Sequence, residues 1–387
     1  GIAALVKAEP LDVWKDYLAV RAIDRAAPFL PKAFADAHFA MYGTTLRGTP
    51  KARDRWKRAI DTANDIVGDA VGRAYVEKHF KPEYRAEIES MVDQIVAAFA
   101  RRIDALPWMA PETRAKAKAK LRTLKVGIAY PDTWREDTGL DIVRGDPLGN
   151  YERSELFKMQ KELAKVGKPM PRGEWVMNPQ TVNAVNLPVR NALNFPAAIL
   201  EPPFYAPDAT PAVKFAAIGA IIGHEISHSF DDQGALFDDR GRFANWWTAE
   251  DLKHFEQSAA ALVAQYNAYR PFPDASVNGK QTLSENIADL AVIAAAHDAW
   301  KASLGGKPAP VTVDGFTGDQ QFFISYAQSW QSKMREPALR QRLMTDGHSP
   351  GRYRALTVRN LDEWYGAFGI QTGEPLYLPP DQRVRVW

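Results

Sequence analysis

The 387-residue sequence has no cysteine, which excludes disulfide bonds, thiolate metal sites and cysteine nucleophiles. It also lacks any apolar run close to the roughly 18 residues of a membrane-spanning helix. The opening residues lack the basic segment and apolar core of a signal peptide, and no initiator methionine precedes them, so we expect that the chain begins partway through a longer protein. An excess of one charge is missing too: 49 basic and 47 acidic residues leave a net charge of +2, which gives no electrostatic reason to bind nucleic acid or a membrane.

The composition is that of a soluble globular protein, with 46% hydrophobic and 25% charged residues, and the length suits two or three domains. Apolar residues recur at helical spacing in residues 11–23 and 85–103, so roughly the first 125 residues are predicted to be helical. Residues 111–125 are rich in basic side chains but contain no interleaved aromatic residues. We interpret them as a solvated helix face and not as a nucleic-acid patch.

The pattern changes after residue 125, where we predict a short strand at 126–131 and a loop rich in Asp, Gly and Pro at 131–149. The segments 174–184 and 191–200 are predicted to be strands or extended chain. Further helices are predicted at residues 156–166, 211–230, 248–269, 282–300, 319–335 and 360–368.

His224, Glu225 and His228 form an H-E-x-x-H motif within the predicted helix 211–230. Side chains four residues apart lie on one helix face, so both imidazoles can reach one metal ion, and the glutamate lies beside any water that the metal holds. This spacing is the signature of zinc peptidases, with the glutamate as general base. The rest of the helix is largely apolar, and a buried His-Glu-His group needs compensation that a metal would supply. Short motifs also recur by chance, and most helical histidines bind no metal.

A catalytic zinc site takes three protein ligands and leaves one position for water. The all-histidine continuation fails because Asp231 and Gly234 occupy the third and sixth positions after His228, so a carboxylate must complete the set. The two aspartates that follow the motif extend only one further turn along the helix, away from the metal, and two downstream glutamates lie in an ordinary charged helix. The candidates are Asp231, Asp232, Glu250, Glu256 and Glu285.

Glu285 is the favoured third ligand. It lies in the sequence LSENIADLA, where Asp289 follows four residues later on the same helical face, and two inward-facing carboxylates need a cation or hydrogen-bond donors. The structural alternative is a capping box between Thr282 and Glu285. If Glu285 binds the metal, Asp289 becomes a partner that accepts a hydrogen bond from a ligand histidine.

A set of segments that occur in order resembles the neprilysin-like family of zinc metallopeptidases, which includes endothelin-converting enzyme and bacterial endopeptidase O. The segments are VNA at 182–184, FPAAILEPPF at 195–204, GHEISHSFDDQG at 223–234, NWWT at 245–248, SENIAD at 284–289, HSPGRYR at 348–354 and RVW at 385–387. The resemblance is most specific from residue 175 onward. The first half of the family's sequence has no counterpart here, so the resemblance implies the C-terminal portion of a longer protein. The absence of the disulfides of vertebrate members points to a bacterial member.

The resemblance implies a role for each motif residue. It places His224, His228 and Glu285 on the family's zinc ligands, with one zinc per chain, and Glu225 on the general base. Asp289 falls on the carboxylate that partners the first histidine.

Other residues fall on the family's substrate-binding positions. His348 matches the histidine that stabilises the oxyanion, and Arg354 matches the arginine that grips a substrate carbonyl. Asn183 and Ala184 match the edge segment that hydrogen-bonds the peptide backbone. The walls of the hydrophobic pocket for the residue after the scissile bond match Ile199, Phe204, Ile221 and Trp330.

The implied fold is α+β and predominantly α, with a thermolysin-like zincin catalytic domain at residues 151–387 and part of a helical capping domain at residues 1–150. We place the boundary between residues 126 and 172.

The implied activity is that of a zinc-dependent endopeptidase that hydrolyses oligopeptides on the amino side of hydrophobic residues. Its partners would be peptide substrates and the missing N-terminal portion of the same protein, and a periplasmic or secreted location suits the family in many bacteria. Two other classes stay open: a non-catalytic zinc-containing peptide-binding protein, and a helical interaction module in which the motif is accidental.

Overall fold

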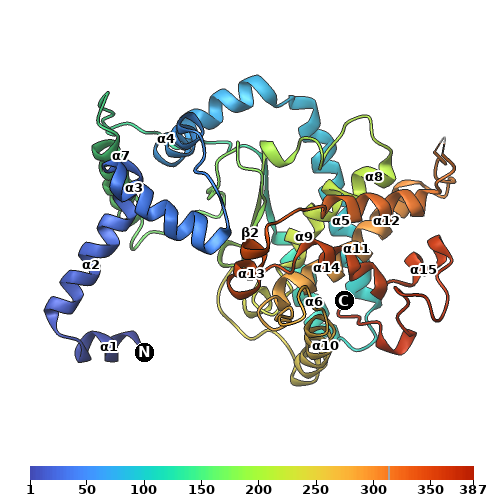
Figure 1. The fold of residues 1–387 in the computed structure, drawn as a ribbon. Coiled ribbons are helices and arrows are strands. Elements are labelled where there is room, and N and C mark those ends of the chain that lie inside the picture. The colour runs from blue at the N-terminus through green and yellow to red at the C-terminus, as the bar shows by residue number, and fades with distance from the viewer. Residues whose placement is uncertain (313) are drawn as a thin grey trace. The chain divides into compact units, whose positions relative to one another are not determined.

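The computed structural model describes residues 1–312 and 314–387 and is mostly helical with one small sheet, which confirms the predicted fold class (Figure 1). The α-helices are α1 (Ile2–Ala8), α2 (Leu11–Ala26), α3 (Lys32–Phe39), α4 (Arg55–His79), α5 (Pro82–Ala105), α6 (Pro111–Thr123), α7 (Pro147–Leu163), α8 (Pro211–Ala216), α9 (Ile218–Ser227), α10 (Ala249–Asn267), α11 (Leu283–Ser303), α12 (Gly318–Ser329), α13 (Glu336–Thr345), α14 (Gly351–Ala355) and α15 (Asp362–Phe368). The strands are β1 (Lys125–Ala129), β2 (Val185–Leu187) and β3 (Ala192–Pro196). Across these described residues, no helix combines the length and the apolar character needed to span a bilayer.

The chain divides into two compact units. Unit 1 comprises residues 1–68, 136–168 and 334–341, and unit 2 comprises residues 69–135, 169–333 and 342–387. The boundary range expected from the sequence, 126–172, contains two of the points where the chain passes between units, after residues 135 and 168. The division into domains at residue 150 stays a prediction.

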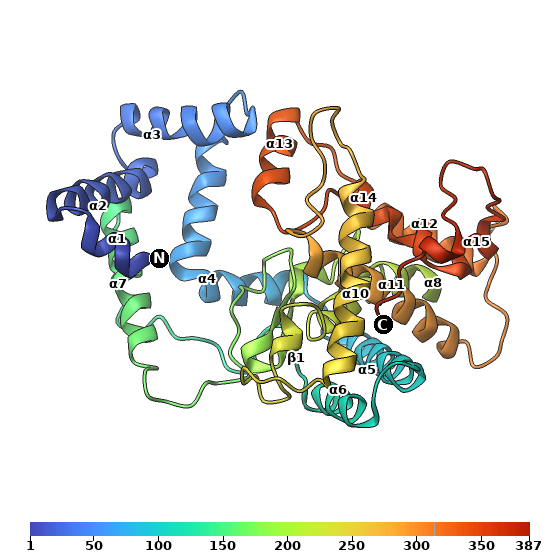
Figure 2. The same ribbon diagram turned by 90° about the horizontal axis from the view of Figure 1, so that it is seen from below.

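Unit 1 is built from helices that bury little of their surface. The segment after α2 lies near the first turns of α7 (Figure 2). The rings of Phe29 and Tyr151 stack there with centroids 5.1 Å apart. Helix α7 begins at Pro147, earlier than the predicted 156, because Asp146 caps it by accepting a hydrogen bond from the Gly149 amide at 2.9 Å. Among the described residues of unit 1, only two side chains are buried, Ala27 and Ser154.

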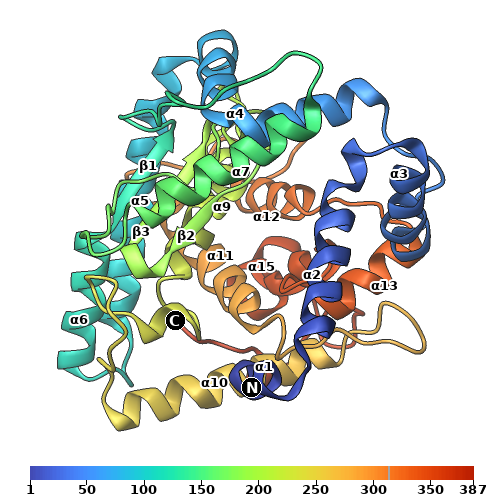
Figure 3. The same cartoon turned by 90° about the vertical axis from the view of Figure 1, so that its left-hand side faces the viewer.

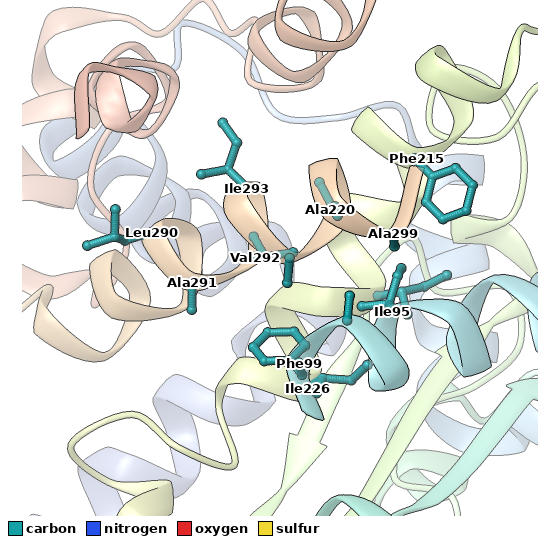
Figure 4. Close-up of a cluster of buried hydrophobic side chains, with 14 of the residues drawn as sticks. Ile95, Phe99, Phe215, Ala220, Ile226, Leu290, Ala291, Val292, Ile293 and Ala299 are labelled. Carbon is teal, nitrogen blue, oxygen red and sulfur yellow. The ribbon is translucent and has the colours of Figure 1, made fainter. Parts of the chain in front are cut away.

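Unit 2 is organised around α11, which packs against α5, α8, α9 and α10. Apolar side chains from α5, α9 and α11 meet in one cluster (Figure 4). Gly223 of α9 allows a close helix crossing, since a Cβ at this position would lie 2.4 Å from Val292 Cγ2 of α11. The motif helix and the helix that carries Glu285 are therefore neighbours held together by the core.

The sheet has the strand order β1-β3-β2 and lies against α5 and α9 (Figure 3). The central strand β3 is fully buried, pairs in parallel with β1 and pairs antiparallel with the edge strand β2. The predicted strand at 126–131 and the extended segment 191–200 correspond to β1 and β3. The prediction for 174–184 was wrong as a strand: this segment forms turns, and pairing starts only at Val185.

The predicted helix 211–230 is two helices, because the backbone of Ala217 leaves the helical region with φ −94° and ψ −89°. Helix α8 is capped at its start by Thr210, and α9 then carries the motif. Nothing in the local sequence FAAIGA marks this break. It follows from packing, since α8 lies against both α12 and α11 while α9 packs mainly on α11.

Candidate metal centre

Helix α9 presents His224 and His228 on one face, as their spacing predicts. Their Nε2 atoms lie 3.0 Å apart, with the rings nearly perpendicular at 85°. Ligand atoms of His224, Glu225 and His228 all lie within 4.8 Å of one another. His224 and Glu225 are buried, so the group lies in the apolar wall that the sequence predicts.

Glu285 projects from the first turn of α11 toward both imidazoles. Its Oε2 lies 3.1 Å from His224 Nε2, and its Oε1 lies 3.6 Å from His228 Nε2. Ligand atoms bonded tetrahedrally to zinc at about 2.0–2.1 Å are about 3.3 Å apart. The three side chains therefore have the donor atoms and the spacing that fit a zinc ion.

The capping-box alternative for Glu285 is wrong. Thr282 makes no side-chain cap to α11. Its hydroxyl instead donates to the Asn278 carbonyl at 3.0 Å and accepts from Asn286 Nδ2 at 2.9 Å. Glu285 is thus available to the histidines.

The other candidate carboxylates lie elsewhere. Asp231 Oδ2 is 2.6 Å from His228 Nδ1, on the far side of the ring from Nε2, and Asp231 Oδ1 accepts from the Gln233 and Gly234 amides. Asp231 therefore fixes the orientation of His228. Asp232 accepts from Ser284, and the two remaining candidates are exposed on α10, namely Glu250 and Glu256.

Asp289 holds the other histidine. Its Oδ1 lies 3.0 Å from His224 Nδ1, and its carboxylate accepts two 2.7 Å hydrogen bonds from Arg354 Nε and Nη2. Asp289 is fully buried, so this bidentate pairing offsets the cost of burying its charge.

The electrostatics of the site favour positive charge between the carboxylates. Burial alone would lower the pKa of His224, but hydrogen bonds to Asp289 and Glu285 outweigh it and raise this pKa to about 10. Burial would raise the pKa of the Glu285 carboxyl, and the hydrogen bond and charge of His224 hold that pKa well below its ordinary value. The same cation preference would serve a proton or a divalent metal ion.

His348 reaches the group from the loop before α14. Its Nε2 lies 3.2 Å from Glu285 Oε2, and its Nδ1 lies 2.7 Å from Asp346 Oδ1. Ser349 ties this loop to α11 by donating to Asn286 Oδ1 at 2.8 Å. Burial would raise the pKa of the Asp346 carboxyl, but hydrogen bonds from the backbone and ring of His348 hold it below its usual value.

Arg354 adjoins the site through Asp289 and packs under Trp330, whose ring centroid is 3.7 Å from the guanidinium carbon. Ile221 lies one turn before Glu225 on α9 and is partly buried, as are Phe204 and Trp330, while Ile199 is buried. Their role as pocket walls stays a prediction, as does the grip of Arg354 on a substrate carbonyl.

The edge strand is bonded to the motif helix. Asn183 and Ala184 directly precede β2, and Asn186 within it donates from Nδ2 to the Glu225 carbonyl at 2.6 Å and to Ser229 Oγ at 3.0 Å. The strand predicted to bind a peptide backbone is therefore fixed to the helix that carries the motif.

Sequence reasoning missed the orienting roles of Asp231 and Asp346. For Asp346, the feature of the sequence that could have indicated this role is its position two residues before His348. The signal for Asp231 was weaker, because its contact depends on α9 ending at Ser227 so that the chain turns back toward His228.

Comparisons with known proteins agree with this geometry. Two models described as peptidase family M13 match residues 1–131 and 183–384. The neutral endopeptidase of Lactobacillus helveticus is 33% identical over 99% of this chain and 58% of its own length, and human endothelin-converting enzyme-like 1 is 31% identical over 100% of this chain and 50% of its own.

Solved structures that resemble this chain include a zinc metalloprotease and a bacterial PepO. The zinc metalloprotease Zmp1 of Mycobacterium tuberculosis, in complex with an inhibitor, is 42% identical with a TM-score of 0.95 over 100% of this chain and 59% of that one. PepO of Lactobacillus rhamnosis is 34% identical with a TM-score of 0.84 over 97% of this chain and 58% of that one. The chain thus spans between 50% and 59% of the length of these relatives.

Proposed function

Because the chain belongs to peptidase family M13, we propose that it carries the catalytic site of a zinc-dependent endopeptidase that hydrolyses oligopeptides. The observation that supports this most directly is the approach of Glu285 to within 3.1 Å of His224 Nε2 and 3.6 Å of His228 Nε2, beside Glu225. These three ligands would hold one zinc per chain. When bound, zinc would supply Lewis acidity for the scissile carbonyl and activation of the attacking water.

The chain's own residues would carry the proton. Glu225 would accept a proton from the attacking water and deliver it to the leaving amine nitrogen. Asp231 and Asp289 would hold the two ligand histidines in the tautomer that leaves Nε2 free for the metal.

Two further side chains would act on the substrate. His348, held at Nδ1 by Asp346, would donate from Nε2 to the carbonyl oxygen as negative charge develops on it. Arg354 would grip a substrate carbonyl, and the edge segment at Asn183 and Ala184, directly before β2, would hydrogen-bond the peptide backbone.

The preferred substrate residue would be hydrophobic and would follow the scissile bond. This rests on four apolar side chains, of which Ile199 is buried and Phe204, Ile221 and Trp330 are partly buried. A contribution from a further portion of a longer protein, and a periplasmic or secreted location, stay predictions.

The test measures metal content and peptide-library cleavage with and without a chelator. We expect about one zinc per chain and cleavage that the chelator abolishes. Glu225→Gln should keep zinc and lose about 100- to 10,000-fold in kcat, the usual range for a general base. Glu285→Ala should lose zinc, whereas the matched control Glu256→Ala, on the exposed face of α10, should keep both zinc and activity. Wild-type cleavage rates in Glu225→Gln, or stoichiometric zinc in Glu285→Ala, would refute these assignments.

A further inference from the structure

Lys120 of α6 is almost completely buried, with 2% of its surface exposed. The prediction that residues 111–125 form a solvated face is therefore wrong at this position. Its ammonium donates to three backbone carbonyls, those of Ser229 at 2.5 Å, Gly234 at 2.8 Å and Phe237 at 2.8 Å. All three acceptors belong to residues 229–237, which we call the post-motif segment because it directly follows His228.

The post-motif segment touches the metal centre at two places. Asp231 Oδ2 lies 2.6 Å from His228 Nδ1, as described above. Asp232 Oδ1 accepts from Ser284 Oγ at 2.6 Å, and Ser284 directly precedes Glu285. A single stretch of chain thus sets the position of two of the three proposed ligands, one from each helix.

The geometry around Lys120 requires a full ammonium group. Carbonyl oxygens only accept hydrogen bonds, and three of them need three N–H donors, which a neutral amine lacks. Burial lowers the pKa of Lys120 to about 7 and so opposes the charge, while the nearby carboxylate of Asp231 favours it. The rings of Phe230 and Trp246 add cation–π contacts at 5.5 and 5.7 Å. We call the three carbonyls around this ammonium group the carbonyl cage.

We propose that Lys120 is a positioning residue for the zinc centre. It fixes the post-motif segment so that Asp231 keeps the His228 ring aimed at the metal and Asp232 keeps the start of α11 in place. The proposal rests on the proposed function, because it concerns the same ligand set. Lys120 touches neither substrate nor metal, and its effect passes entirely through the segment.

The test compares Lys120→Met with Arg114→Met in the full chain. Arg114 is a matched control from the same helix, since its Nη2 donates to the carbonyls of Leu106 and Met109, which lie outside the post-motif segment. Zinc affinity is measured by competition with a chromophoric chelator. We expect Lys120→Met to bind zinc about 10- to 100-fold more weakly, the usual effect of losing an outer partner of a metal ligand, and Arg114→Met to bind it normally.

Two further measurements separate positioning from general destabilisation. The visible spectrum of the Co²⁺-loaded protein should change in Lys120→Met and not in Arg114→Met, because it reports ligand geometry. In a double-mutant cycle with Asp231→Asn, the losses in zinc affinity should be less than additive, because both changes release the same histidine. If Lys120→Met does not fold, Lys120→Gln carries the same tests, since its amide keeps two of the three donors and should give a smaller loss.

The outcomes are distinguishable. If the wild type binds no zinc, the proposed function fails whatever Lys120 does. If the wild type binds zinc and Lys120→Met matches it in affinity and Co²⁺ spectrum, the positioning role is overturned while the function stands. An equal loss of affinity in Arg114→Met would overturn it too.

Discussion

At the scale of single residues, each histidine of the centre is held by a carboxylate at Nδ1, which leaves Nε2 directed into the site. The pairs are His224 with Asp289, His228 with Asp231, and His348 with Asp346. The spacing of residues within one helix predicted the first partner, because Asp289 shares a face with Glu285. The other two contacts lie in turns outside a regular helix, where helical spacing does not predict which side chains meet.

The Asp346–His348 pair gives a prediction about catalysis. Asp346→Asn should lower kcat by about 10- to 100-fold, because the ring of His348 loses the carboxylate that orients it. The zinc content should not change, since neither residue is a proposed ligand. His348→Ala should cost more, on the order of 100- to 1000-fold, because it removes the donor itself. Steady-state kinetics with metal analysis measure both, and a larger loss in Asp346→Asn than in His348→Ala would contradict the assignment.

At the scale of helices, the centre depends on how closely α9 and α11 cross. Gly223 lies at the crossing, directly before His224, where an added Cβ would lie 2.4 Å from Val292 Cγ2 and 3.2 Å from Ile95 Cγ2. The glycine is thus required by the neighbouring side chains and not by its backbone conformation.

Gly223→Ala should destabilise the protein by about 1–3 kcal/mol through overpacking, partly offset by the better helix propensity of alanine. Gly366→Ala is the matched control, because Gly366 lies inside α15 with no atom within 4 Å of an added Cβ. We expect it to be neutral or to stabilise the protein by up to about 1 kcal/mol. Denaturant unfolding measures both free energies, and equal effects of the two substitutions would contradict the crossing argument.

Helices with long apolar periodicity were predictable from the sequence. Their ends were predictable where a residue type that commonly caps helices stands at the boundary. Residues 248–269 correspond to α10, which Thr248 caps by accepting from the Asp251 amide at 3.1 Å. The predicted helix 319–335 stops at Ser329 instead, and a separate helix follows from Glu336. That end, like the break at Ala217, is decided by contacts between elements that lie far apart in the sequence.

The grouping of the proposed ligands was more predictable than the fold around them, because metal chemistry constrains which residue types can meet. Two histidines one turn apart require a third donor, and this requirement favours Glu285 among the downstream carboxylates. Lys120 was missed for the opposite reason: a lysine among basic neighbours has the pattern of an exposed helix, and only its three carbonyl partners show otherwise.

At the scale of the whole molecule, the two units should differ in local stability. Helix α2 of unit 1 has no buried residue, whereas α10 of unit 2 has five. Amides in α2 should therefore exchange with solvent faster than those in α10, because little apolar surface opposes local opening. Hydrogen exchange read by mass spectrometry checks this, and equal protection of the two helices would contradict it.

Acid should weaken the packing of α11 on α12 through Asp319, which lies 2.7 Å from His297 Nε2 and accepts from Lys301 at 2.8 Å. Burial would raise the pKa of this carboxyl, but its bonds to Lys301 and His297 bring it below the ordinary 3.8. Because the folded pKa is the lower one, the stabilisation is present above pH 3.8 and is lost as the pH falls through the folded value.

Asp319→Asn should therefore cost about 1 kcal/mol at pH 7, a modest figure because the pair is partly exposed. The difference between wild type and variant should shrink below about pH 4, where the wild-type carboxyl also becomes neutral. Urea unfolding at several pH values measures this difference, and a gap that stays constant down to pH 2 would argue against it.

The enclosure of Lys120 also makes that side chain a chemical reporter. Acylating reagents attack a neutral, accessible amine, so a brief treatment of the folded protein should modify the exposed Lys116 on the same helix and spare Lys120. Acylation at Lys120 would then report opening of the carbonyl cage. Peptide mapping could measure the rate of this acylation with metal bound and after the metal is removed by a chelator.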